Sequence, residues 1–96
     1  MNLRQSLATA IKAIRKSRGL TQEDFAVVSS RTYLSSLERG LKSPTIDKID
    51  EISSVLKIHP AAVVLLAYAM QAEPGDRVSL IANISDEAIE AAQNFP

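Results

Sequence analysis

Hydrophobic residues in the first part of the chain recur at the spacing of an α-helix. One apolar face is formed by residues three and four apart: Leu7, Ala10, Ile11 and Ile14. This spacing predicts an amphipathic helix whose lysines and arginines face outward. Gly19 is expected to end it, because glycine readily takes the left-handed conformation found after a helix C-terminus.

A short second helix is expected directly after this glycine. Thr21 is typical of an N-cap, and Asp24 stands at the third helical position, where a capping box places its partner. This helix is expected to bury Phe25 and Ala26. The serines at positions 29 and 30 interrupt it, because serine side chains compete for backbone hydrogen bonds and favour helix ends.

The stretch "SSRTYLSSLERG" predicts a third helix over residues 31–39. Ser30 is its expected N-cap and Gly40 its end. Leu34 and Leu37 are spaced to anchor it in a core, which leaves a face of hydroxyl and basic side chains outside.

Two apolar helices are expected after this stretch. Thr45 is the expected cap of the first, whose apolar stripe has helical spacing: Ile46, Ile49, Ile52 and Leu56. Pro60 suits the first position of the second, which is expected to run to about Gln71. The sequence "EPGD" at 73–76 predicts a turn that separates these helices from a C-terminal tail. In this tail, the hydrophobic residues of 77–84 fit both the period of a strand and that of a helix. Ser85 is the expected N-cap of a final helix.

Composition supports a small all-α protein. The 96 residues are 46% hydrophobic but only 4% aromatic, and they include no cysteine. A chain of this length builds one core, so we expect one domain over residues 1–72 and a C-terminal extension over 73–96. No clustered metal ligands and no thiol or histidine-paired nucleophile are evident, so we expect neither a metal, a cofactor nor an enzyme.

Charge is divided sharply along the chain although the formal net charge is zero. Residues 1–46 carry eight basic and three acidic side chains, whereas residues 47–96 carry three basic and eight acidic ones. The first half can therefore present a basic surface to a polyanion. The longest apolar run, residues 61–70, is about half the roughly 20 residues of a spanning helix, and we expect a soluble cytoplasmic protein without a membrane partner.

Three motifs in this order resemble the Cro/C1-type (XRE-like) helix-turn-helix family: "GLTQE" at 19–23, "LERG" at 37–40 and "SPT" at 43–45. The resemblance covers about residues 5–70. It implies a compact five-helix, lambda repressor-like fold in which the second and third helices bind double-stranded DNA. The third helix would lie in the major groove, where each base pair displays a distinct set of donors and acceptors.

The resemblance also implies site residues. Base contacts are expected from three residues of the third helix: Arg31, Thr32 and Ser36. Phosphate contacts are expected from four residues around it: Gln22, Arg39, Lys42 and Ser43. Arg15 and Glu38 match a family ion pair that ties the first helix to the third. Tyr33 is expected either to cover the core edge or to touch DNA.

One segment departs from the family pattern. Between Ala26 and Ser30 the family usually has five residues including a turn glycine, and this chain has only "VVS". The second helix or its turn is therefore expected to be shortened.

The function indicated is a transcriptional regulator that binds a near-palindromic operator as a homodimer. One short helix reads too few base pairs to be specific in a genome, so two copies are expected to act together. We assign dimerisation to the expected fifth helix, which begins at Pro60 and runs to about Gln71, and to the apolar residues of the tail: Val78, Leu80, Ile81, Ile84 and Ile89. Two alternatives remain open, a DNA-binding antitoxin with a toxin as protein partner and a helix-turn-helix module used only for protein interaction.

Overall fold

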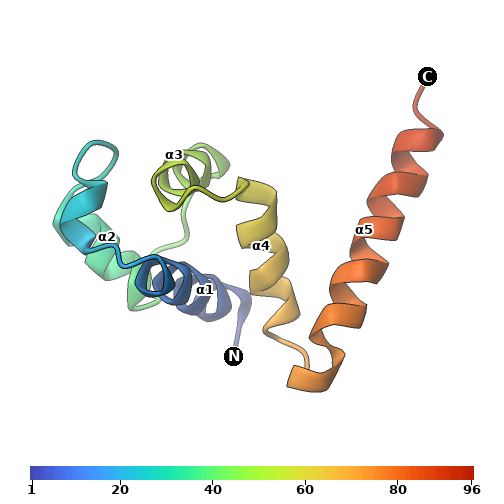
Figure 1. The fold of residues 1–96 in the computed structure, drawn as a ribbon, viewed down its shortest axis with the longest axis horizontal. Helices are drawn as coiled ribbons and strands as arrows, with labels where there is room; N and C mark the ends of the chain where they lie inside the picture. Colours follow the sequence, from blue (N-terminus) through green and yellow to red (C-terminus); the bar gives the residue numbers. More distant parts are fainter.

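The structure, a computed structural model, describes all residues 1–96 and contains helices but no strand (Figure 1). Its elements in chain order are α1 (Leu3–Ser17), the 3₁₀ helix η1 (Gln22–Phe25), α2 (Arg31–Glu38), α3 (Ile46–Leu56), α4 (Pro60–Ala69), the 3₁₀ helix η2 (Pro74–Asp76) and α5 (Arg77–Gln93). The prediction of an all-α fold is confirmed.

The first helix begins at a cap that the sequence analysis missed. The Asn2 side chain accepts a hydrogen bond from the Gln5 N–H (2.9 Å), and the Gln5 side chain accepts one from the Asn2 N–H (3.1 Å). This reciprocal pair satisfies two backbone donors that the helix leaves free. At the other end Gly19 adopts φ +68°, as predicted for the residue that ends α1.

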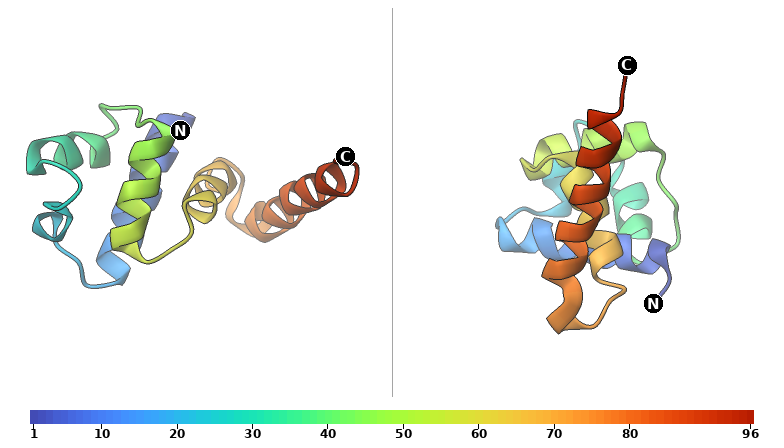
Figure 2. Two further views of the ribbon diagram at one scale, coloured as in Figure 1. Left: turned by 90° about the horizontal axis from the view of Figure 1, so that it is seen from above. Right: turned by 90° about the vertical axis from the view of Figure 1, so that its right-hand side faces the viewer.

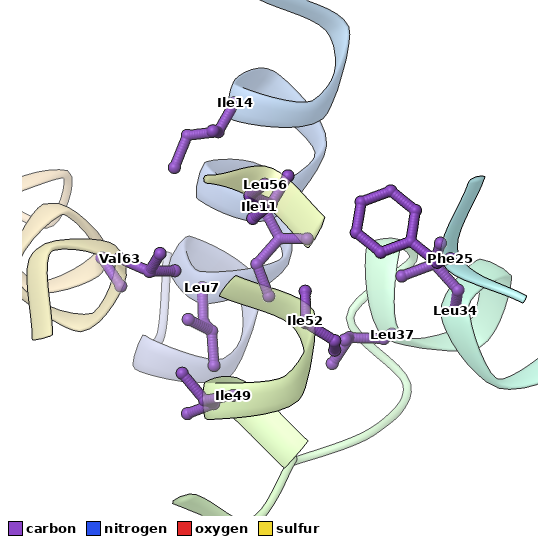
Figure 3. Packing of buried hydrophobic residues seen from close by; sticks show 11 residues of the cluster. Leu7, Ile11, Ile14, Phe25, Leu34, Leu37, Ile49, Ile52, Leu56 and Val63 are labelled. Atoms are coloured by element: carbon purple, nitrogen blue, oxygen red, sulfur yellow. The ribbon is translucent and has the colours of Figure 1, made fainter. Parts of the chain in front are cut away.

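The core lies where α1, α3 and α4 meet, and η1 and α2 close one side of it (Figure 3). Its members are mostly the residues predicted from helical spacing: Leu7, Ile11, Ile14, Phe25, Leu34, Leu37, Ile49, Ile52, Leu56, Val63 and Ala67. Phe25, Leu34 and Leu37 have no exposed surface. They attach η1 and α2 firmly to the rest of the molecule, since burying one such side chain contributes roughly 1.5–3 kcal/mol.

Three predictions about buried or capping residues are wrong. Ala26 is exposed, because η1 ends at Phe25 and the chain turns away from the core there. Ile46 is 85% exposed, because it occupies the first position of α3, beyond the part of the stripe that the core covers. Ser85 does not cap a helix: it lies in the middle of α5, which runs unbroken from Arg77.

The last helix stands apart from the other four. Figures 1 and 2 show α5 projecting from the end of α4, at the opposite end of the molecule's long axis from η1 and α2. It packs against α4 and η2, and none of its 17 residues is buried. The segment 77–84, which fitted both periods, is helical.

No single helix is long and apolar enough to cross a membrane. Only α3 and α4 together reach the required length and composition, and they are bent by 102° at the break between them.

Candidate nucleic-acid interface

The two ends of α2 are fixed by local hydrogen bonds. The Ser30 hydroxyl oxygen accepts from the Tyr33 N–H (3.1 Å), as predicted for its N-cap. After Glu38 the chain turns through Gly40 at φ +76°, and the Leu41 N–H donates to the Ser36 carbonyl (3.0 Å). With Leu34 and Leu37 buried between these ends, the opposite face of α2 is directed to solvent.

That exposed face gathers most of the predicted DNA-contacting residues. Gln22 of η1 and residues of α2 line one shallow polar depression: Arg31, Thr32, Ser35 and Arg39. Ser35 was not predicted, although it stands four residues after Arg31 on the same helix face. Ser36 is half-buried and outside this depression, and its hydroxyl lies 3.5 Å from Nη2 of Arg39.

Basic and hydroxyl side chains continue beyond the end of α2. Lys42 and Ser43 are exposed in the loop between α2 and α3, and neither side chain has a hydrogen-bond partner within the protein. Arg31 is likewise exposed and has no acidic partner. These groups are therefore free to bind an external anion.

A buried ion pair connects α1 to the end of α2. Arg15 donates to Glu38 twice, from Nε to Oε2 (2.6 Å) and from Nη2 to Oε1 (2.9 Å), and from Nη1 to the Leu20 carbonyl (2.8 Å). The hydrogen bonds to Glu38 raise the pKa of Arg15, aided by the attraction of the carboxylate and opposed by desolvation. Gln22 Nε2 also donates to Glu38 Oε1 (3.2 Å), so one carboxylate holds α1, η1 and α2 together.

The turn between η1 and α2 is built without a left-handed residue. No residue from 26 to 30 has a positive φ. The N–H groups of Val28 and Ser29 both donate to the Phe25 carbonyl (3.0 and 2.9 Å), which folds the chain tightly after a second helix of only four residues. The predicted shortening is confirmed, and the missing glycine is not needed.

An apolar groove of about 880 Å³ lies between α5 and the corner of α3 and α4, and two of the five tail residues predicted to mediate dimerisation line it. Ile84 and Ile89 line it together with Ile46, Leu65 and Tyr68. Leu80 and Ile81 are half-buried outside it, and Val78 is 79% exposed. On α5 the groove is lined only by uncharged residues, Ile84, Ser85, Ala88 and Ile89, whereas α3 contributes Asp47 and Asp50 to its wall.

Comparison with known proteins gives a consistent result. Residues 11–63 match the family described as Helix-turn-helix. The chain is 37% identical over 60 residues to the HTH-type transcriptional regulator y4dJ of Sinorhizobium fredii, covering 60% of this chain and 78% of that protein. It is 34% identical over 62 residues to the control protein C.BamHI of Bacillus amyloliquefaciens, covering 62% of this chain and 76% of that protein.

A third relative is longer, and one solved structure has the same fold. The immunity repressor protein of Bacillus phage phi105 is 39% identical over 56 residues, which cover 56% of this chain but only 39% of the repressor. The crystal structure of the clp gene regulator ClgR from C. glutamicum superposes with a TM-score of 0.69 at 30% identity, over 75% of this chain and 96% of that one. The protein therefore belongs to the Cro/C1-type helix-turn-helix family of DNA-binding transcriptional regulators.

Proposed function

We propose that the protein binds double-stranded DNA in a sequence-specific manner, with α2 in the major groove. The observation that carries this proposal is the exposed face of α2, where Arg31, Thr32 and Arg39 gather beside Gln22. Arg31 can bond guanine O6 and N7 together, and Thr32 offers a hydroxyl and a methyl group. Ser36, whose hydroxyl lies beside Arg39, has a short side chain and would contact only a base edge that comes close to the helix.

Phosphate binding is proposed for the groups that surround this face. Gln22 precedes it, Arg39 ends it, and Lys42 and Ser43 follow in the exposed loop. Such contacts fix the register of a protein on the duplex without reading its sequence. The surplus of basic side chains in residues 1–46 supports the same assignment, because it attracts a polyanion to this end of the molecule.

A homodimer is proposed because α5 is incomplete by itself. Helices in proteins gain most of their stability from packing an apolar face, yet α5 buries no residue and leaves Ile89 55% exposed. A second copy offers the same apolar helix and groove, so one surface repeated about a twofold axis would cover both. In this proposal residues 1–72 bind DNA and 73–96 pair the subunits.

The dimer would act on an operator with two related half-sites. Twofold symmetry places the two copies of α2 in successive major grooves, about 34 Å apart, which requires a roughly palindromic sequence. The names of the relatives, a transcriptional regulator, a phage immunity repressor and a control protein, support the regulation of transcription as the result of binding.

Selection of duplexes from a randomised library by the full chain tests this function. We expect a palindromic consensus and an affinity that falls steeply between 50 and 200 mM salt, because bound phosphates release counterions. Failure to enrich any sequence, with no salt-dependent binding to random DNA, would indicate a module for protein interaction. An enriched sequence without inverted symmetry would contradict the proposed homodimer.

A further inference from the structure

One lysine of α3 reaches the turn that precedes the recognition helix. Lys48 Nζ donates to the Val28 carbonyl (2.8 Å) and to Glu51 Oε2 (3.1 Å), and it lies 5.4 Å from the centroid of the Tyr33 ring. A single ammonium group therefore contacts the turn, α2 and its own helix. The side chain is only 26% exposed.

The Val28 carbonyl depends on this lysine. It lies outside any helix, and no backbone N–H donates to it. A half-buried carbonyl that has no donor loses hydrogen bonds to water without replacing them, which destabilises the folded state. Lys48 thus supplies the donor that this carbonyl would otherwise lack.

The position of this contact matters because the turn leads directly into the reading end of α2. Leu34, Leu37 and the Glu38 ion pair hold the later part of the helix, whereas Arg31 and Thr32 lie before these anchors. At that end the Ser30 cap joins only neighbouring residues, three positions apart. The Lys48 contact spans 20 residues and ties the turn to the core helix α3.

We propose that Lys48 is a positioning residue for base recognition, fixing the entry of α2 through the Val28 carbonyl and the Tyr33 ring. This inference rests on the proposed function, since it concerns how Arg31 and Thr32 are aimed at base edges. Lys48 does not itself contact DNA: its ammonium is engaged by a carbonyl, a carboxylate and an aromatic face. In this proposal the Lys48 contact, and not a turn glycine, fixes the path of the turn between η1 and α2.

The test compares Lys48→Met with Lys12→Met. Methionine keeps most of the aliphatic stem and removes the donor, while Lys12 is an exposed residue of α1 without a protein partner and controls for the loss of one charge. Each variant is titrated at one salt concentration with the duplex that the wild-type chain selects from a random library, and with a scrambled duplex of equal composition. Lys48→Met is expected to lower the ratio of the two affinities about tenfold, and Lys12→Met to leave it unchanged.

Two further measurements separate positioning from general stability. Lys48→Arg keeps donors for the carbonyl and a cation for the ring, so it is expected to restore most of the ratio. In a double-mutant cycle, the effects of Lys48→Met and Arg31→Ala on affinity for the selected duplex are expected to be non-additive. If Lys48→Met already displaces Arg31 from its base, removing the Arg31 side chain costs less affinity. The 15N shift of the Ser29 amide, which shares its peptide group with the Val28 carbonyl, is expected to move in Lys48→Met only.

Three outcomes would overturn the proposal. An unchanged affinity ratio in folded Lys48→Met would show that the turn holds its path without the lysine. Equal losses on both duplexes would make Lys48 a phosphate contact. Additive effects with Arg31→Ala would exclude action through that residue. If Lys48→Met is unfolded at 25 °C, Lys48→Leu, which also lacks a donor, replaces it in all three assays. Failure of the proposed function is distinguishable, because the wild-type chain would then select no sequence.

Discussion

Arg15 and Glu38 form a doubly hydrogen-bonded ion pair whose side chains are only 10% and 3% exposed. The pair joins α1, which contributes to the core, to the last turn of α2, the proposed recognition helix. Because the pair raises the pKa of Arg15, its contribution is fully present at neutral pH and is lost only as pH rises through that elevated value. Alkaline conditions below the ordinary pKa of an arginine side chain are therefore not expected to break it.

Removing one partner of this pair is expected to destabilise the protein severely. Glu38→Ala leaves a buried guanidinium unpaired and is expected to cost about 3–5 kcal/mol, a large part of the roughly 5–15 kcal/mol that stabilises a typical domain. The free energy of unfolding, measured by urea titration, checks this. The double variant Arg15→Met with Glu38→Met is the control: buried ion pairs are often replaceable by apolar side chains, so it is expected to be much more stable than Glu38→Ala. A loss in the double variant as large as in Glu38→Ala would contradict this account.

Arg31→Ala is expected to weaken binding to the selected operator by roughly 1–3 kcal/mol and to relax preference at one base pair. Arg31 is exposed and unpaired, so the fold is expected to keep its stability. The matched control is Lys42→Ala, which removes an exposed charge from the neighbouring loop and is expected to weaken all duplexes alike. Electrophoretic mobility assays on operator and scrambled DNA distinguish the two. Equal losses on both duplexes for Arg31→Ala would reassign it to phosphate contact.

Ile89→Glu is expected to dissociate the proposed homodimer, because it places a carboxylate in the apolar groove. Sedimentation equilibrium across a range of concentrations should show the dimer dissociation constant rising at least tenfold. Asn83→Glu adds the same charge to an exposed position of α5 that does not line the groove, and it is expected to leave the equilibrium unchanged. A wild-type chain that stays monomeric at high concentration would refute the assignment.

Lys57→Gly is expected to stabilise the protein. Lys57 follows α3 at φ 58° and is the only non-glycine residue with a positive φ. Relief of a left-handed conformation gives roughly 1–2 kcal/mol, partly offset by the greater freedom of glycine in the unfolded chain, so the melting temperature should rise by a few degrees. Gly19→Ala is the opposite test: its added Cβ meets no atom within 4 Å, so any loss comes from the backbone alone. A lower melting temperature for Lys57→Gly would contradict this reasoning.

Local signals predicted much of this structure. Ser30, Thr45 and Pro60 lie at the helix starts that capping chemistry assigns to them, and helical spacing identified most of the core. These predictions succeeded because each depends on residues within one or two turns of one another. The resemblance to known regulators supplied the roles of the exposed face, which spacing by itself could not give.

The predictions that failed depend on tertiary packing. Ser85 carries the signal of a helix start, but the helix already runs from Arg77, and its Ile84 and Ala88 continue the face that borders the groove. Ile46 fits the apolar stripe, yet how far the core extends along α3 is decided by its neighbours. The contact between Lys48 and Val28 joins positions 20 residues apart, so no local sequence pattern could predict it.

The separation of α5 from the core has a consequence for how such regulators diversify. Because α5 buries no residue and packs mainly against α4 and η2, its sequence can change without disturbing the side chains that hold α2. After a gene duplication, two copies could therefore acquire different pairing surfaces while still recognising the same DNA, or keep one pairing surface while their targets diverge. In the proposed function, the residues that select the partner subunit and those that select the DNA target lie at opposite ends of the molecule (Figure 2).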